Sequence, residues 1–156
     1  ISKLLAGVFV SILQVYAFLM IASLWDIIPP ITGYFTILPA LIVSGLMLGS
    51  LGMFLSSAIK QLENFAGVMN FVIFPMFFAS SALYPLWKIE ETSEWLFYVC
   101  QYNPFTYAVE SIRFSLYSQI NIEYTIGIFI FTLIFILLSI LGYDPARGNL
   151  QKKGGK

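Results

Sequence analysis

Long stretches without a charged side chain constrain this chain more than any other feature. The first runs from Leu4 to Trp25, between Lys3 and Asp26, and contains 22 uncharged residues. At about 1.5 Å per residue, a helix of this length crosses a hydrocarbon core of about 30 Å. Charged residues make up only 10% of the sequence, against about 25% in soluble domains. The sequence therefore predicts a polytopic membrane protein.

Three further apolar stretches each suit a membrane helix, so the sequence predicts four membrane helices in one domain. Short polar or proline-containing segments separate the first three of these helices. Because the chain begins at Ile1 and not at Met, we expect it to be a fragment of a longer protein. The predicted spans cover about residues 4–25, 35–59, 65–86 and 124–143, and residues 144–156 form a polar tail. Residues 1–156 are thus expected to form a single all-α transmembrane domain.

Proline and small residues punctuate the first half of the chain. Residues 26–34 predict a turn, because Pro29 and Pro30 disfavour a helix interior and Gly33 permits unusual backbone angles. The second span then carries small residues spaced i, i+4, i+7 and i+11, which share one helical face and allow a neighbouring backbone to approach closely. We interpret this face as helix packing inside a bundle, with a role in dimerisation left open. Its members are Gly45, Gly49, Gly52 and Ser56.

Two other residues stand out within the predicted spans. Gln14 lies at the middle of the first span. It fits either a hydrogen bond between helices or a polar group that lines a transport pathway. Pro75 lies near the centre of the third span, where it removes one backbone hydrogen bond and predicts a kink.

Two short amphipathic segments separate the third span from the last. The first, WLFYVCQY, begins at Trp95 after the polar stretch KIEETSE, which we expect to be a loop. Neither segment reaches the length of about 20 apolar residues that a spanning helix needs. The sequence therefore predicts an external re-entrant or interfacial helical hairpin over about residues 93–118. The alternative that its aromatic residues merely anchor it in the membrane interface stays open.

The second amphipathic segment has a clear start signal. Asn103 is a favourable N-cap residue and Pro104 suits the first helical position, so a helix should begin there. Glu110 and Arg113 lie close enough on this helix to pair. We expect one face to meet membrane or protein and the other to meet water. The apolar face carries Phe105, Ala108, Val109, Ile112 and Leu116, and the polar face carries Thr106, Glu110, Arg113 and Tyr117.

The distribution of basic residues predicts the orientation in the membrane. Four spans place Lys88 and Arg113 on one side and six basic residues on the other. Cytoplasmic loops carry an excess of Lys and Arg, so both ends of the chain should be cytoplasmic and the hairpin external. The six are Lys3, Lys60, Arg147, Lys152, Lys153 and Lys156.

Several function classes lack their usual residues. The sequence has no histidine, a single cysteine and no Walker A, GxGxxG or CxxC motif. The four predicted spans hold no ionisable residue, which disfavours an ion-coupled pump and a membrane-embedded lipid-modifying enzyme. The net charge is zero, so nothing indicates a nucleic-acid partner. We expect no catalytic residue, bound cofactor or metal in this chain.

The order of these features resembles a known family. A proline-bearing span, then SSALYPL, Trp95, NPFTYAVESIR and a last span are similar to the membrane (permease) subunit of type-2 ATP-binding-cassette (ABC) exporters. The resemblance covers about residues 65–145, and the four spans would be the third to sixth of six. The first two spans and the loop that normally contacts the ATPase have no counterpart here, and KIEETSE lacks a proline that is common in the family. The matching residues are Pro75, Pro85, Leu86, Trp95, Asn103, Pro104, Thr106, Tyr107, Glu110 and Arg113.

The resemblance implies a transport subunit that is not itself an enzyme. Two permease chains would pair in the inner membrane with two ABC ATPase subunits, which hydrolyse the ATP. Asn103 and Pro104 would form the break of the external hairpin, and Glu110 with Arg113 an external polar clamp. The substrate would be a drug, a lipid or a glycan-like molecule. The alternative is a non-transporting membrane anchor or scaffold subunit of a complex.

Overall fold

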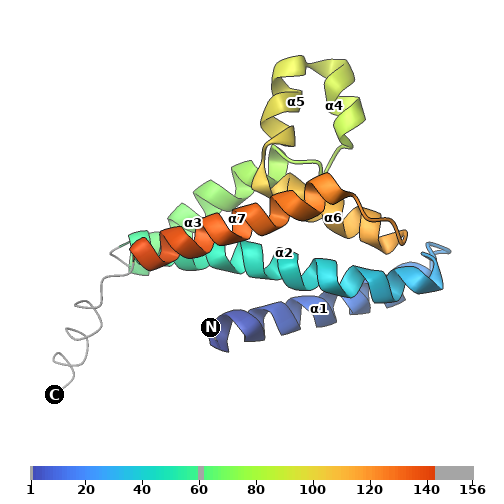
Figure 1. Ribbon diagram of the computed structural model, residues 1–156, viewed down its shortest axis with the longest axis horizontal. Helices are drawn as coiled ribbons and strands as arrows, with labels where there is room; N and C mark the ends of the chain where they lie inside the picture. The colour runs from blue at the N-terminus through green and yellow to red at the C-terminus, as the bar shows by residue number, and fades with distance from the viewer. Residues whose placement is uncertain (1, 60–61, 143–156) are drawn as a thin grey trace.

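The computed structural model describes residues 2–59 and 62–142. Within these ranges every regular element is a helix (Figure 1). The prediction of an all-α membrane protein is confirmed. The helices are α1 (Ser2–Ser23), α2 (Ile31–Ala58), α3 (Leu62–Phe78), α4 (Leu86–Thr92), α5 (Glu94–Gln101), α6 (Pro104–Leu116) and α7 (Ile122–Leu141). The predicted polar tail at residues 144–156 lies outside the described residues.

Three of these helices are long and apolar enough to cross a membrane. They are α1, α2 and α7, with qualifying stretches of 20, 27 and 20 residues. The apolar part of α3, Ala66–Phe78, is shorter than a membrane span. The third predicted span, residues 65–86, therefore differs from the structure, because α3 ends at Phe78 and turns follow it. Those turns contain Ser80 and Ser81, residue types that hydrogen-bond to nearby backbone and favour helix ends and turns.

Two predicted loop segments are helical. The second long helix begins at Ile31, directly after Pro30, so Gly33 lies inside α2 and has no positive φ angle. The expected role of Gly33 in a turn is wrong. Most of the stretch KIEETSE, predicted as a loop, belongs to α4. Its Lys and Glu residues are good helix formers, and Pro85 at the N-cap position sets the start of the helix.

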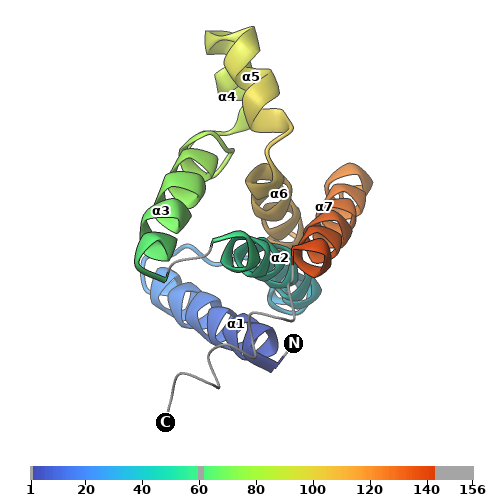
Figure 2. The same cartoon turned by 90° about the vertical axis from the view of Figure 1, so that its left-hand side faces the viewer.

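Helix α2 is the centre of the bundle. It contacts α1, α3, α6 and α7, while α1 contacts only α2 among the described helices (Figures 1 and 2). One core cluster joins α1 to α2 through Leu19, Ile37 and Leu41. A second joins α2, α6 and α7 through Met47, Ala108 and Ile128. The helices thus pack as layers on either side of α2.

The predicted hairpin over residues 93–118 is divided between two parts of the structure. Helices α4 and α5 pair with each other and project away from the other helices (Figure 1). Helix α6 instead lies against α2 and α7. The projecting hairpin is therefore α4–α5, and α6 belongs to the bundle.

Gly33 is required for the close approach of α6 to α2. A Cβ atom built on Gly33 would collide with the carbonyl oxygen of Leu116, at the end of α6. Backbone atoms cannot move aside as a flexible side chain can. A side chain at position 33 would therefore push the end of α6 away from α2.

We expect Gly33→Ala to lower the free energy of unfolding by about 1–3 kcal/mol, the usual range for overpacking. Gly67→Ala is the matched control, because Gly67 is also helical and a Cβ added to it would meet no described atom within 4 Å. The control should be neutral or slightly stabilising, since alanine favours helix over glycine. Thermal unfolding in detergent, followed by tryptophan fluorescence, measures both variants. Equal effects of the two substitutions would contradict the role assigned to Gly33.

Candidate functional site

Helix α6 enters the bundle alongside α2 and runs in the opposite direction. Its end lies near the start of α2, where the Thr36 hydroxyl donates to the carbonyl oxygen of Ser115 at 2.6 Å. Further back, Ala108 packs between Met47 of α2 and Ile128 of α7. The start of α6 is therefore level with the middle of α2, so this helix is re-entrant and does not lie on top of the bundle.

Asn103 connects the start of α6 to the end of α3. Its side-chain oxygen accepts from the backbone N–H of Phe105 at 2.9 Å, which caps α6. Its amide nitrogen donates to the carbonyl oxygens of Met76 at 2.8 Å and Ala79 at 2.6 Å. Carbonyls in the last turn of a helix lack partners within that helix. One side chain thus satisfies backbone groups of two helix ends, and Pro104 follows it at the first turn of α6.

Thr106 and Arg113 hold the chain that follows α3. The backbone N–H of Ser81 donates to Oγ1 of Thr106 at 3.2 Å, and Nη2 of Arg113 donates to the carbonyl oxygen of Ser81 at 3.0 Å. Ser81 is fully buried and lies outside any helix. Its backbone groups would otherwise be desolvated without a partner. The two α6 side chains therefore replace the hydrogen bonds that a continuing helix would have supplied.

Glu110 and Arg113 form an ion pair. Nη1 of Arg113 lies 2.5 Å from Oε1 of Glu110. Glu110 is 6% exposed, whereas the Arg113 side chain is 40% exposed. A buried carboxylate requires a compensating charge and hydrogen bonds. Arg113 supplies the charge to Glu110 while it also binds Ser81. That this pair acts as an external clamp stays a prediction.

These four side chains share one face of α6, at i, i+3, i+7 and i+10. The predicted polar face of Thr106, Glu110, Arg113 and Tyr117 meets water only in part, because Thr106 and Glu110 are buried whereas Tyr117 is exposed and Arg113 partly so. The face packs against the non-helical backbone after α3. We call this set the α3–α6 junction: Asn103, Thr106, Glu110 and Arg113, with the backbone of residues 76–81.

The junction left only an indirect signal in the sequence. The polar residues of α6 were visible, but their partners are backbone groups about 25–32 positions earlier in the chain, as in the Thr106–Ser81 and Arg113–Ser81 bonds. The run of small residues after Pro75 was the available hint. Pro75 itself lies inside α3, and the N–H of Ala79 donates to its carbonyl oxygen at 2.9 Å. The kink there stays a prediction.

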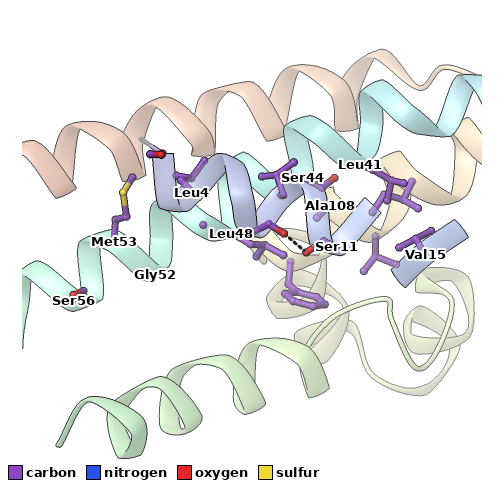
Figure 3. A pocket seen from close by; sticks show the side chains of 18 residues that line it. Leu4, Ser11, Val15, Leu41, Ser44, Leu48, Gly52, Met53, Ser56 and Ala108 are labelled. Carbon is purple, nitrogen blue, oxygen red and sulfur yellow. Dashed lines mark hydrogen bonds between the residues drawn. The ribbon is translucent and has the colours of Figure 1, made fainter. Parts of the chain in front are cut away.

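All four small residues of this α2 face line a cavity of about 770 Å³ between α1, α2 and α6 (Figure 3). Two of them also face α1, since a Cβ on Gly45 would lie 3.0 Å from Val8 and one on Gly49 would lie 3.2 Å from Leu4.

The predicted pathway residue Gln14 is exposed and does not line this cavity. Ser44, which sequence reasoning did not single out, does line it (Figure 3). Only the packed structure shows that the Ser44 hydroxyl lacks a partner among the described residues. Sequence alone therefore offered no means of ranking Ser44 above the other serines of α2.

Two observations concern the titratable groups of the described residues. Among the residues that the structure describes, no group of three or more His, Cys, Asp or Glu side chains could hold a metal ion. Cys100 is buried in α5, and burial raises the pKa of its thiol, which disfavours the reactive thiolate. The chemistry of the site is therefore hydrogen bonding and packing between helices.

The comparison with protein families gives a match over most of the chain. The model of the family described as ABC-2 type transporter matches residues 1–117, which include α1 to α6. The resemblance drawn from the sequence is thereby confirmed. No curated protein and no solved structure matches the chain.

We expect Asn103→Asp to lower the free energy of unfolding by about 2–4 kcal/mol. The variant keeps the oxygen that caps α6 but loses the two N–H donors, which leaves the carbonyls of Met76 and Ala79 unpaired. Asn121→Asp is the matched control, because Asn121 caps α7 only through its oxygen. Its effect should stay within about 0.5 kcal/mol, since Asp and Asn are similar N-caps. Thermal unfolding in detergent measures both, and a harmless Asn103→Asp would refute the proposed link between α3 and α6.

The ion pair should respond asymmetrically to substitution. Arg113→Gln leaves the buried Glu110 carboxylate without a counter-charge, so we expect a loss of about 2–3 kcal/mol. Glu110→Gln leaves Arg113 able to reach water and a side-chain oxygen able to accept from it, so the loss should be below about 1 kcal/mol. The double variant should be more stable than Arg113→Gln alone. Unfolding of all three variants under the same conditions measures the coupling, and the reverse order of the single variants would disprove this account.

Proposed function

Because this chain belongs to the ABC-2 type transporter family, we propose that it is the permease subunit of an ATP-driven exporter. The family match over residues 1–117 shows that the chain contains the membrane domain of an ABC transporter. That match is also the observation that carries the proposal. Members of this family generally pair with an ABC ATPase subunit and are generally not catalytic themselves.

The α3–α6 junction supports a role in which α3 and α6 move as one unit. Side chains of α6 bind the backbone at the end of α3, and α6 packs on α2 and α7. A tilt of α3 would therefore carry α6 with it. ATP binding by a partner subunit can drive such a tilt only if the nucleotide-bound ATPase has a higher affinity for the tilted state. In this proposal the junction transmits the movement and the ATPase supplies the free energy.

The remaining parts of the proposal concern partners and orientation. Two permease chains, as a homodimer or heterodimer, would form the transport path in the inner membrane, with ABC ATPase subunits on the cytoplasmic side. Both ends of the chain would be cytoplasmic, and the α4–α5 hairpin external. ATP would bind to the partner and not to this chain. The exported molecule would be a drug, a lipid or a glycan-like compound.

The second candidate is a membrane anchor or scaffold that does not transport. The many exposed aromatic residues of the α4–α5 hairpin favour it, since aromatic side chains alone can hold a segment at a membrane interface. They include Trp87, Trp95, Tyr98 and Tyr102. An anchor needs no change of shape when ATP binds, and this difference separates the two functions without knowledge of the substrate.

We expect a spin label at Glu91 to report ATP-driven movement. Glu91 is exposed at the end of α4, and Cys100→Ala removes the single cysteine of residues 1–156, which is buried. The full-length complex with its ATPase, labelled at Glu91→Cys on both permease chains, should show a changed distance distribution between the labels when ATP and vanadate are added. ADP alone is the control and should leave it unchanged. Pulsed electron paramagnetic resonance measures the distances.

An unchanged distribution with ATP and vanadate would favour the anchor. Hydrolysis of ATP by the purified permease chain alone would contradict the separate ATPase subunit.

A further inference from the structure

A cavity between α1, α2 and α6 has the size of a small-molecule site. Its volume is about 770 Å³, within the range of about 300–1,000 Å³ that is usual for ligand pockets. Figure 3 shows side chains from α1 and α2, with Ala108 of α6, around it. Helix α1 and helix α3 make no contact with each other in the described part of the chain. The described lining residues come from α1, α2 and α6, and none of them comes from α3.

The lining of this cavity excludes an ionised ligand group. Among the residues that the structure describes, the lining consists of apolar side chains, glycines and serines, and none of these is charged. A charge placed there would lose its hydration without gaining a counter-ion, which is strongly unfavourable. An uncharged molecule with an apolar body is the chemistry that this lining accommodates.

Ser44 adds a specific polar feature to the lining. Its residue is 3% exposed, and its Oγ atom has no hydrogen-bond partner within residues 2–59 and 62–142. Serines within helices commonly donate to a carbonyl oxygen about one turn earlier. Ser11 does so to Gly7 at 3.0 Å, and Ser50 to Leu46 at 2.6 Å. The Ser44 hydroxyl lacks this bond, although a buried hydroxyl without a partner is unfavourable. Because the Oγ atom itself is buried, it reaches a ligand in the cavity only when the Ser44 side chain turns to another rotamer, and it breaks no hydrogen bond to a described residue in doing so.

We propose that this cavity binds an uncharged amphiphile whose hydroxyl, ester or amide group hydrogen-bonds to Ser44. The apolar body of the ligand lies along α1 and α2, between Gly7 and Leu48 among other lining residues. A bilayer lipid without a charged headgroup and an exported amphiphile share this chemistry. All of the described lining residues come from one chain.

Gly7 offers a direct way to close the cavity. It lines the cavity, and a Cβ built on it would meet no described atom within 4 Å. A side chain can therefore start from position 7 without a clash at its Cβ, and Gly7→Leu adds apolar bulk to the lining. Gly67 is the matched control, because a Cβ added to it would meet equally open space and it does not line the cavity.

Photolabelling of the full-length protein in lipid nanodiscs tests the site. The probe is a monoacylglycerol that carries a diazirine on its acyl chain, and the comparison probe is a fatty acid with the same chain and an ionised carboxylate. We expect the uncharged probe to label residues of α1, α2 and the start of α6, with saturation and with competition by unlabelled monoacylglycerol. The ionised probe should label them less.

Two pairs of variants make the test specific. Gly7→Leu should weaken binding about tenfold or more, since extra bulk in an apolar pocket has effects of this size, whereas Gly67→Leu should not. Ser44→Ala should weaken binding about 2- to 10-fold through the loss of one hydrogen bond. Its control is Ser50→Ala, because Ser50 is buried but does not line the cavity. Ser44→Ala should not lower thermal stability and should raise it slightly, because it removes a buried hydroxyl that has no partner in the described part of the protein.

Three results would overturn the proposal. The first is labelling spread over all helices without saturation. The second is equal labelling of Gly7→Leu and Gly67→Leu. The third is no labelling at all, as expected if a protein helix filled the cavity.

A second experiment, which rests on the proposed function, distinguishes a bilayer lipid from an exported compound as the ligand. ATP is added to the complex with its ATPase before illumination. Labelling that falls during ATP turnover identifies an exported compound, and labelling that stays constant identifies a bilayer lipid; both support the site. Because the first arm contains no ATP, failed labelling leaves the proposed function intact. An unchanged spin-label distance would in turn leave the labelling result intact.

Discussion

The need to satisfy backbone groups at the end of α3 determines the rest of this structure. Within a membrane no water is available to bind exposed carbonyl oxygens, so a helix that stops inside the bundle needs other donors. The amide of Asn103 provides two of them, to Met76 and Ala79, and Thr106 and Arg113 bind the next exposed backbone groups at Ser81. Because these donors sit on α6, that helix must enter the bundle. Its position beside α2 and α7 follows from this requirement.

The ion pair is best understood as part of the same requirement. A buried ion pair often contributes little net stability, because desolvation offsets the attraction between the charges. Here Arg113 also donates to the carbonyl oxygen of Ser81, so the pair fixes where its guanidinium can lie. Glu110 orients Arg113, and Arg113 holds the chain after α3. The ion pair therefore matters more for the position of the Arg113 guanidinium than for the free energy of folding.

The sequence predicted what depends on short-range patterns. The long charge-free runs identified α1, α2 and α7, because hydrophobic length alone decides whether a helix can span. The pair Asn103–Pro104 identified the start of α6, since capping is local. The sequence pattern did not predict α4. Its charged residues suggested a loop, although Lys and Glu favour helices. The partners of Thr106 and the unpaired hydroxyl of Ser44 in the described part of the chain depend on which helices meet, and no spacing along the chain encodes that.

Helix α6 connects the cavity to the end of α3 through its two faces. Phe105 lines the cavity and also packs edge-to-face on Phe77 of α3, with ring centroids 5.7 Å apart. A ligand that contacts Phe105 therefore contacts a side chain that also packs on α3, and the end of α3 is bound by the α3–α6 junction. Ligand occupancy of the cavity and the tilt of α3 are coupled only to the extent that the ligand binds more tightly to one tilted state of the protein than to the other. A ligand that displaces Phe105 would therefore disturb its contact with Phe77, which is the route by which the cavity can act on α3.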